Sequence, residues 1–208
     1  TGGTGSIYVD AGTGTMDMAA DSSLSAPGGS IRVAAGSTIS LGVLNGANLS
    51  LISGGDVLRA TGSAVNLTST GGLRIDAVGT IGTLLDPLQT AVVSLSAHAM
   101  NGGIFILESD DINITGVSVV TPVVGTDAQP TLVTDLEQSD LEAGLNQNIL
   151  LSSSLGSISL NDGGDGDLLA VEAQGSGWVR LQAAVNLLVN GGVVSGTGNL
   201  TLIADADV

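Results

Sequence analysis

A short unit of alternating apolar and hydroxyl residues occurs twice, far apart, in this chain. Residues 48–57 read Asn-Leu-Ser-Leu-Ile-Ser-Gly-Gly-Asp-Val, and residues 199–208 read Asn-Leu-Thr-Leu-Ile-Ala-Asp-Ala-Asp-Val. Period-two alternation places the leucines on one face of a β-strand and the Ser or Thr on the other, and the turn that follows is too short for a helix. One such unit cannot bury its apolar face alone, so a chain built from these units is predicted to stack them.

Looser relatives of this unit fill much of the remaining sequence. Between residues 31 and 81 the expected strands begin about every eight residues, with one step of ten, which is the spacing of a short strand and a short turn. The first residues of these strands are Ile31, Ile39, Leu49, Val57, Val65, Leu73 and Ile81. No helical pattern of about ten to fifteen residues alternates with the strands, which argues against an α/β organisation.

The repeated strands leave two all-β architectures, a sandwich and a solenoid. A sandwich needs hairpin turns, and Asn-Gly or Asp-Gly pairs begin at positions 45, 101, 162 and 190. The recurring Asn-Leu-Ser/Thr-Leu unit favours a parallel β-helix instead, because each coil position there lies about 4.8 Å above the same position of the previous coil. We therefore predict an all-β, right-handed parallel β-helix (solenoid) with three short strands per coil and about six or seven coils. It forms a single domain over residues 1–208.

Two segments break the rhythm of the strands. Gly82–Thr90 contains a proline and is predicted to be a loop. Thr121–Gln147 is longer and acidic and contains two prolines. Because a structureless loop of that length is uncommon in a compact domain, residues 121–147 are predicted to be an insertion that protrudes from the solenoid. Within the insertion, Leu132, Leu136 and Leu141 have the spacing of one helical stripe, so part of it is expected to be helical.

The composition restricts the partners of the chain. Its 208 residues include 32 Gly, no Cys, no Lys and only four Arg, and the formal net charge is -16. A hydrophobic fraction of 43% argues against disorder, and the acidity argues against nucleic acid or anionic lipid as a partner. Gly, Asn, Ser and Thr interrupt the apolar runs, so no membrane insertion is predicted. The lack of Cys fits neither a disulfide-stapled domain nor a zinc-thiolate site, and it is compatible with export in an unfolded state.

The units at residues 48–57, 156–160 and 198–204 resemble the repeats of filamentous-haemagglutinin-like adhesins and other giant repetitive bacterial exoproteins. The resemblance covers about three quarters of the chain and leaves out the insertion. It implies an extracellular, non-catalytic β-helical stalk at the bacterial cell surface, acting in adhesion, cell–cell contact or biofilm. The expected partner is a protein or glycan on a host or neighbouring cell. The chain is then a monomeric internal segment of a larger protein, whose open coils could stack end to end.

The densest group of carboxylates lies in a Gly-rich turn at residues 161–167. Asp162, Asp165 and Asp167 could supply oxygen ligands to Ca²⁺ there. The turn resembles a calcium-binding nonapeptide repeat, but its Asp residues are out of register and only one copy is present. A solvated Asp-Gly turn accounts better for the sequence, so no metal ligand is assigned. A Ca²⁺-dependent structural module remains an alternative.

Glu108–Ile114 resembles the paired-Asp strand of polygalacturonase-type β-helix hydrolases, in which two carboxylates do acid–base work on a glycosidic bond. The other motifs of that family are missing, and the single His, His98, lies in Ala-His-Ala and is predicted to be a surface or satisfied side chain. We therefore predict no enzyme, no catalytic residue and no cofactor, with a polygalacturonase-like carbohydrate-active enzyme as the alternative. Sequons for N-glycosylation, which strand alternation also produces by chance, begin at Asn48, Asn66, Asn113 and Asn199.

Overall fold

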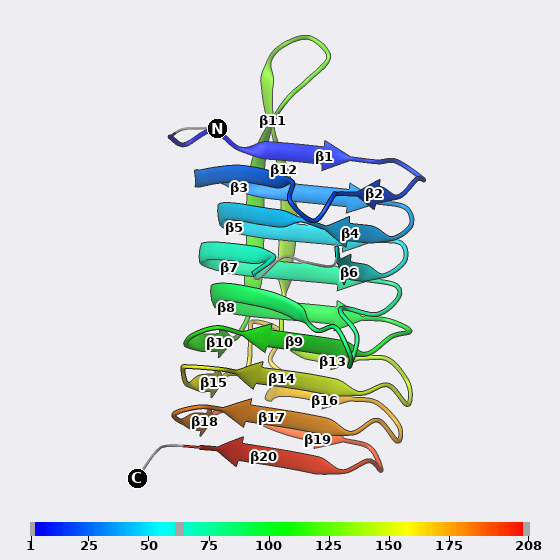
Figure 1. Ribbon diagram of the computed structural model, residues 1–208, viewed down its shortest axis with the longest axis vertical. Helices are drawn as coiled ribbons and strands as arrows, with labels where there is room; N and C mark the ends of the chain where they lie inside the picture. The colour runs from blue at the N-terminus through cyan, green and yellow to red at the C-terminus, as the bar shows by residue number, and fades with distance from the viewer. Residues whose placement is uncertain (1–2, 61–64, 206–208) are drawn as a thin grey trace.

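The computed structural model describes residues 3–60 and 65–205, and throughout these two ranges every regular element is a β-strand (Figure 1). Residues 206–208, which end the second repeat unit, and Ser63 and Ala64, just before the expected strand at Val65, lie outside the described residues. The strands are β1 (Ile7–Asp10), β2 (Met16–Asp17), β3 (Ser23–Ala35), β4 (Ile39–Leu41), β5 (Val43–Ser53), β6 (Val57–Arg59), β7 (Leu67–Ala77), β8 (Leu88–Ala99), β9 (Ile104–Glu108), β10 (Ile112–Ile114), β11 (Val117–Val124), β12 (Pro130–Gln138), β13 (Leu141–Ala143), β14 (Ile149–Ser153), β15 (Ile158–Leu160), β16 (Leu169–Ala173), β17 (Val179–Ala183), β18 (Leu187–Val189), β19 (Gly192–Ser195) and β20 (Leu200–Ala204).

Fifteen of these strands form one large sheet with parallel pairing, β2, β4 and β6 form a second parallel sheet, and β11 pairs with β12 in an antiparallel hairpin. The protein is therefore all-β with a large parallel sheet, an arrangement compatible with a β-helix.

The parallel strands are arranged in three rows, in each of which successive strands stack on one another (Figure 1). Row A holds β1, the C-terminal halves of β3, β5, β7 and β8, and then β13, β16 and β19. Row B holds β2, β4 and β6, and continues through isolated bridges of Ile81 to β9, β14, β17 and β20. Row C holds the N-terminal parts of β3, β5, β7 and β8, together with β10, β15 and β18.

Each row turns aliphatic side chains into a shared interior. In row A, for example, Ile31 pairs with Leu49 and Leu49 with Leu73, and all three side chains are fully buried. Short strands such as β4 and β10 alternate buried and half-buried residues, as period two requires. Burying one Val, Leu or Ile side chain stabilises a fold by about 1.5–3 kcal/mol. The aliphatic side chains stacked along each row are therefore the main source of stability.

Several strands are longer than the eight-residue rhythm predicts. β3 has 13 residues and runs from row C into row A without leaving the sheet, with a shift of register between Ala26 and Ser30. The bend falls on a Pro-Gly-Gly sequence, and Gly29 is required there because a Cβ atom would lie 2.3 Å from the carbonyl oxygen of Gly5. Because β3, β5, β7 and β8 each span two rows, the prediction of separate short strands is wrong for these four.

The two best repeat units do not occupy equivalent places. The first contributes Leu49 to row A, whereas the second contributes Leu200 to row B, where it pairs with Val179. The expectation that like units stack on the same coil position is wrong for this pair. Alternation reports only that a strand has one face toward the interior, and all three rows share that property.

The predicted insertion is a β-hairpin rather than a partly helical loop. It begins at Val117 and ends at Gln138, whereas Leu141 already belongs to the buried part of row A. The helix prediction is wrong because leucines four residues apart also satisfy period two. Leu132 and Leu136 lie on the same outer face of β12 and are both exposed. The predicted loop after Gly82 is found at residues 82–87, and Leu88 then opens β8.

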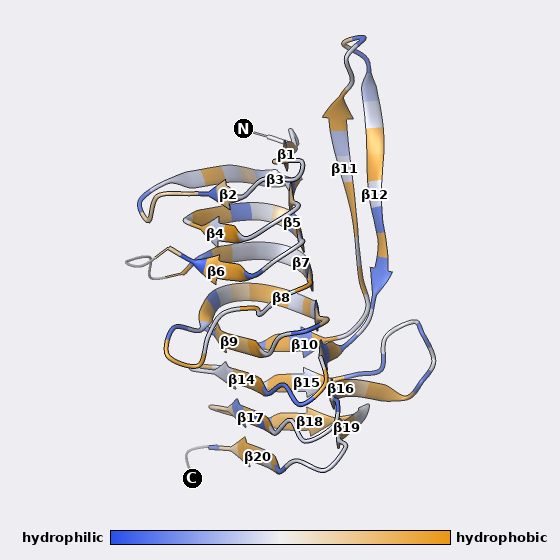
Figure 2. Ribbon diagram, turned by 90° about the vertical axis from the view of Figure 1, so that its right-hand side faces the viewer, coloured by the Kyte–Doolittle hydropathy of each residue, from blue (hydrophilic) through white to orange (hydrophobic). Residues whose placement is uncertain are grey.

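The hairpin runs along the stack, across the outside of row A, and its tip extends past β1 (Figure 2). Polar contacts from the body hold it there. Arg32 Nε donates to both carboxylate oxygens of Asp135, at 2.9 and 3.1 Å, and Arg74 Nε donates to the Leu136 carbonyl at 3.2 Å. Gln138 Nε2 donates to the Ile75 carbonyl at 2.8 Å. The part near the body is thus docked, and only the tip protrudes as the sequence predicts.

Candidate functional site

A groove of about 590 Å³ lies over the outer surface of row C. It brings together the paired aspartates at 110 and 111, which precede β10, and polar side chains on or beside the neighbouring strands β7 and β15. Asp111 Oδ1 accepts a hydrogen bond of 2.7 Å from the Ser157 N–H, just before β15. The groove is lined by Ser69, Ala91, Val92, Val93, Asp110, Asp111, Ile112, Asn113, Ser157, Ser159 and Leu188. Hydroxyl, amide and carboxylate groups on a shallow surface can hydrogen-bond to a polar ligand.

The third acidic residue of this segment, Glu108, has a structural role. Its side chain is fully buried at the end of β9, where Thr90 Oγ1 donates to Oε2 at 2.7 Å and the Ser109 N–H donates to Oε1 at 2.8 Å. Burial raises the pKa of Glu108 to about 7, because desolvation disfavours the charged form more than these donors favour it. Its carboxyl group ties the start of β8 to the end of β9, strands that pair at this junction.

His98 lies on the outer surface of row A, away from this groove. Its Nδ1 is 3.5 Å from Asp76 and its Nε2 is 3.8 Å from Glu142, the residues that pair with it in the strands on either side. The hydrogen bond to Asp76 and the charge of Glu142 raise the pKa of His98. The imidazole is therefore a link in a ladder of side chains, and the structure does not bring it together with Asp110 and Asp111.

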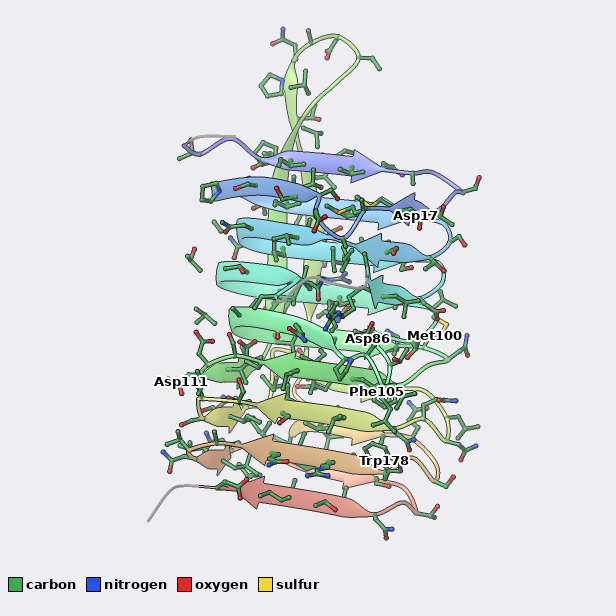
Figure 3. All side chains as sticks on the ribbon, viewed as in Figure 1. Asp17, Asp86, Met100, Phe105, Asp111 and Trp178 are labelled. Carbon is green, nitrogen blue, oxygen red and sulfur yellow. The ribbon has the colours of Figure 1, made fainter. Side chains whose placement is uncertain are left out.

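Two of the three aromatic residues meet on the outer surface of row B. The rings of Phe105 and Trp178 pack edge to face, with centroids 6.4 Å apart and an interplanar angle of 69°. Figure 3 shows both on one side of the stack, with Asp111 toward the other. Trp178 lines a hollow of about 400 Å³ together with Leu84, Leu150, Val179, Arg180, Asn199 and Thr201.

The sequence analysis did not predict this hollow, because Phe105 and Trp178 are 73 positions apart in the chain. The two rings meet because each aromatic residue lies next to a member of the same set of paired, buried residues, a register that the sequence pattern does not encode. Ile104 pairs with Ile149, and Ile149 pairs with Val179.

The aspartates of the Gly-rich turn are joined by a fourth, which sequence reasoning did not include. Asp140 follows the hairpin, has a backbone φ of 66°, and is 5% exposed. One carboxylate oxygen from each of Asp140, Asp162, Asp165 and Asp167 lies within 4.8 Å of the others, and we call these four residues the acidic cluster. Like charges this close to one another repel. Burial, together with the charges of the other three aspartates, raises the pKa of Asp140 to about 7.

The sequon asparagines differ in their surroundings. Asn66 is fully buried and its Nδ2 donates to the Gly42 carbonyl at 3.0 Å, and Asn48 Oδ1 accepts from the Gly72 N–H. Asn113 Oδ1 accepts from Asn161 Nδ2 in a short ladder of asparagines. Only Asn199, beside Trp178, has an exposed side chain among the four. Glycosylation in the folded state is thus sterically compatible with Asn199 and incompatible with Asn66.

Compared with known proteins, the chain matches no family model, no curated protein and no solved structure. Over the ranges that the structure covers, no helix has the length and apolarity needed to cross a bilayer.

Proposed function

We propose that this chain is a segment of a right-handed, three-faced β-helix in a large secreted bacterial surface protein, with a structural and adhesive rather than a catalytic role. The observation that carries the proposal is the stacking of three parallel rows of strands around one aliphatic interior. Such rows lengthen by adding coils, so the fold suits a stalk. In the described residues β1, β18, β19 and β20 each pair with a strand on one side only, which leaves edges where further coils can add.

The surface beside Trp178 is the proposed adhesive site, with a glycan of a host or neighbouring cell as the ligand. Sugar rings stack on aromatic faces, and their hydroxyl groups bond to amide and guanidinium donors. Here the edge contact with Phe105 fixes the indole, and the exposed side chains of Arg180 and Asn199 line the same hollow. The groove beside Asp111 on row C lacks an aromatic ring, since it is lined by carboxylates, hydroxyls, one amide and aliphatic groups.

Binding of the purified chain to a glycan array and to whole cells tests this proposal. We expect saturable binding, weakened about fivefold or more in Trp178→Ala, since loss of one aromatic contact costs about 1 kcal/mol. Tyr8→Ala, which removes a ring from row A, is the matched control and should bind like the parent chain. If the parent binds neither glycans nor cells, or if both variants bind equally well, the proposed site is wrong.

A carbohydrate-active enzyme is the second candidate, favoured by the groove that holds Asp110 and Asp111. Two carboxylates beside a sugar can act as acid and base if their separation suits the mechanism. Release of reducing sugar from pectic polysaccharides, abolished by Asp110→Asn or Asp111→Asn, would establish this activity in place of the structural role.

A further inference from the structure

The acidic cluster connects two separate parts of the chain. Asp140 lies between the hairpin strand β12 and the core strand β13, and the other three aspartates lie in the turn between β15 and β16. The Gly164 N–H donates to Ser139 Oγ at 3.1 Å, and the Gly163 N–H bonds to the Asp140 carboxylate. The backbone therefore holds the two segments together even though their carboxylates repel.

Asp140 differs from the aspartates of the turn because it is buried, and one of its carboxylate oxygens lacks a partner. Its side chain is 95% removed from solvent, with 5% exposure, yet its Oδ1 atom has no hydrogen-bond partner. Asp162 Oδ1 is buried and without a partner in the same way. A buried carboxylate oxygen with no donor loses its hydration without compensation, which folds tolerate when a cation completes the site.

No basic side chain of the protein neutralises this group of charges. The sequence contains four arginines and no lysine, and each arginine is engaged elsewhere. Their partners are Asp135 for Arg32, Asp86 for Arg59, Asp76 for Arg74 and Gln182 for Arg180. His98 contacts Asp76 and Glu142 instead. The described basic side chains therefore supply no compensating charge to the acidic cluster.

We propose that the acidic cluster is a Ca²⁺ site that fastens the base of the hairpin to the turn before β16. Ca²⁺ takes oxygen ligands at about 2.3–2.6 Å, so two of its ligands can be as much as about 5 Å apart, and the oxygens of the cluster lie within 4.8 Å of one another. An adjoining cavity of about 420 Å³, lined by Glu137, Ser139, Gly164 and Asp165, can hold the water ligands that complete the shell.

Calorimetric titration of the chelator-treated chain with Ca²⁺ in about 0.15 M NaCl tests the site, alongside thermal unfolding. We expect one Ca²⁺ per chain. At a concentration a hundred times its Kd, Ca²⁺ should raise Tm by about 5–10 °C, because it binds only the folded state. Asp140→Asn and Asp165→Asn should each weaken Ca²⁺ binding at least about tenfold. Asp21→Asn, an equal charge change on an exposed turn, should bind like the parent.

A rise in Tm could also come from general screening of the negative charge by any salt. Other cations at matched ionic strength distinguish this screening from a specific Ca²⁺ site. Mg²⁺ and Na⁺ at the same ionic strength should raise Tm much less than Ca²⁺ does. An equal rise with all three cations, no saturable uptake by the parent chain, or parental affinity in the cluster variants would each overturn the proposal. Should Asp140→Asn fail to fold, Asp165→Asn decides the question, because that side chain is exposed and is not needed for packing.

Discussion

At the scale of single residues, the buried carboxyl of Glu108 is expected to make stability depend on pH. Its folded-state pKa of about 7 lies above the ordinary value of 4.5, so the folded protein holds this proton more tightly than the unfolded chain does. The resulting stabilisation is complete below about pH 4.5 and is lost as the pH rises through 7, by at most about 3 kcal/mol. Glu108→Gln removes the titration and should flatten this decline, which urea unfolding at pH 5 and pH 8 measures.

The raised pKa of His98 makes stability depend on pH in the same direction. Because Asp76 and Glu142 raise its pKa, the stabilisation from its protonated form also fades as the pH rises. The comparison must therefore be made between Glu108→Gln and the parent chain, both of which keep His98. An unchanged pH dependence in the variant would show that the Glu108 carboxyl does not hold its proton in the folded state.

The candidate sites show which residues a sequence can and cannot bring together. Asp162, Asp165 and Asp167 lie within six positions, so their proximity follows from a single turn. Asp140 joins them only because β13 pairs with β16 in row A, which places the segments that precede these strands next to each other. Strand register of this kind depends on the lengths of the corners between strands, and periodicity does not encode those lengths.

At the scale of elements, β12 of the hairpin is a strand whose leucine spacing also fits a helix. The Leu132 and Leu136 side chains lie outward on β12, so the apolar stripe that suggested a buried helical face is in fact exposed. The buried side of the hairpin carries Val117 and Val119 of β11 together with the polar residues Thr121 and Asp135. The ion pair of Asp135 with Arg32 thus adds to the apolar contacts of Val117 and Val119 in docking the hairpin.

Breaking that ion pair should loosen the hairpin without unfolding the stack. Arg32→Gln leaves the nearly buried Asp135 carboxylate without its charged donor, a loss of about 1.5–3 kcal/mol. We expect faster hydrogen exchange across residues 117–138 and little change in β5 and β7, as measured by mass spectrometry. Arg180→Gln, at an exposed site, is the matched control and should exchange like the parent chain. Uniformly faster exchange over the whole chain would mean that the hairpin is part of the core.

At the scale of the whole molecule, the sequence predicts the parallel stack but not the assignment of strands to rows. In the structure Ile31, Leu49 and Leu73 lie in row A and Ile39, Val57 and Ile81 lie in row B, whereas three strands per coil at the predicted spacing would put Ile31 and Val57 in the same row. The rhythm arises because every row needs inward aliphatic residues at the same spacing. For the same reason one repeat unit is compatible with any row, and the corners at prolines and glycines decide which row it joins.

In stacked parallel strands, the loss of stability from a core substitution depends on whether its strand has neighbours on both sides or lies at the end of the row. Leu181 and Leu202 pair directly, in β17 and β20, but Leu181 is fully buried between neighbouring strands whereas Leu202 is 44% exposed on the last strand described. Leu181→Ala should lower the free energy of unfolding by about 2–5 kcal/mol, since it removes buried methyl groups and leaves a cavity. Leu202→Ala should lower it by less than about 1 kcal/mol, because water already reaches the site. Urea unfolding of both variants under one condition measures the difference. Equal losses would mean that β20 is covered in solution, and the open edge assigned to the stack would then be wrong.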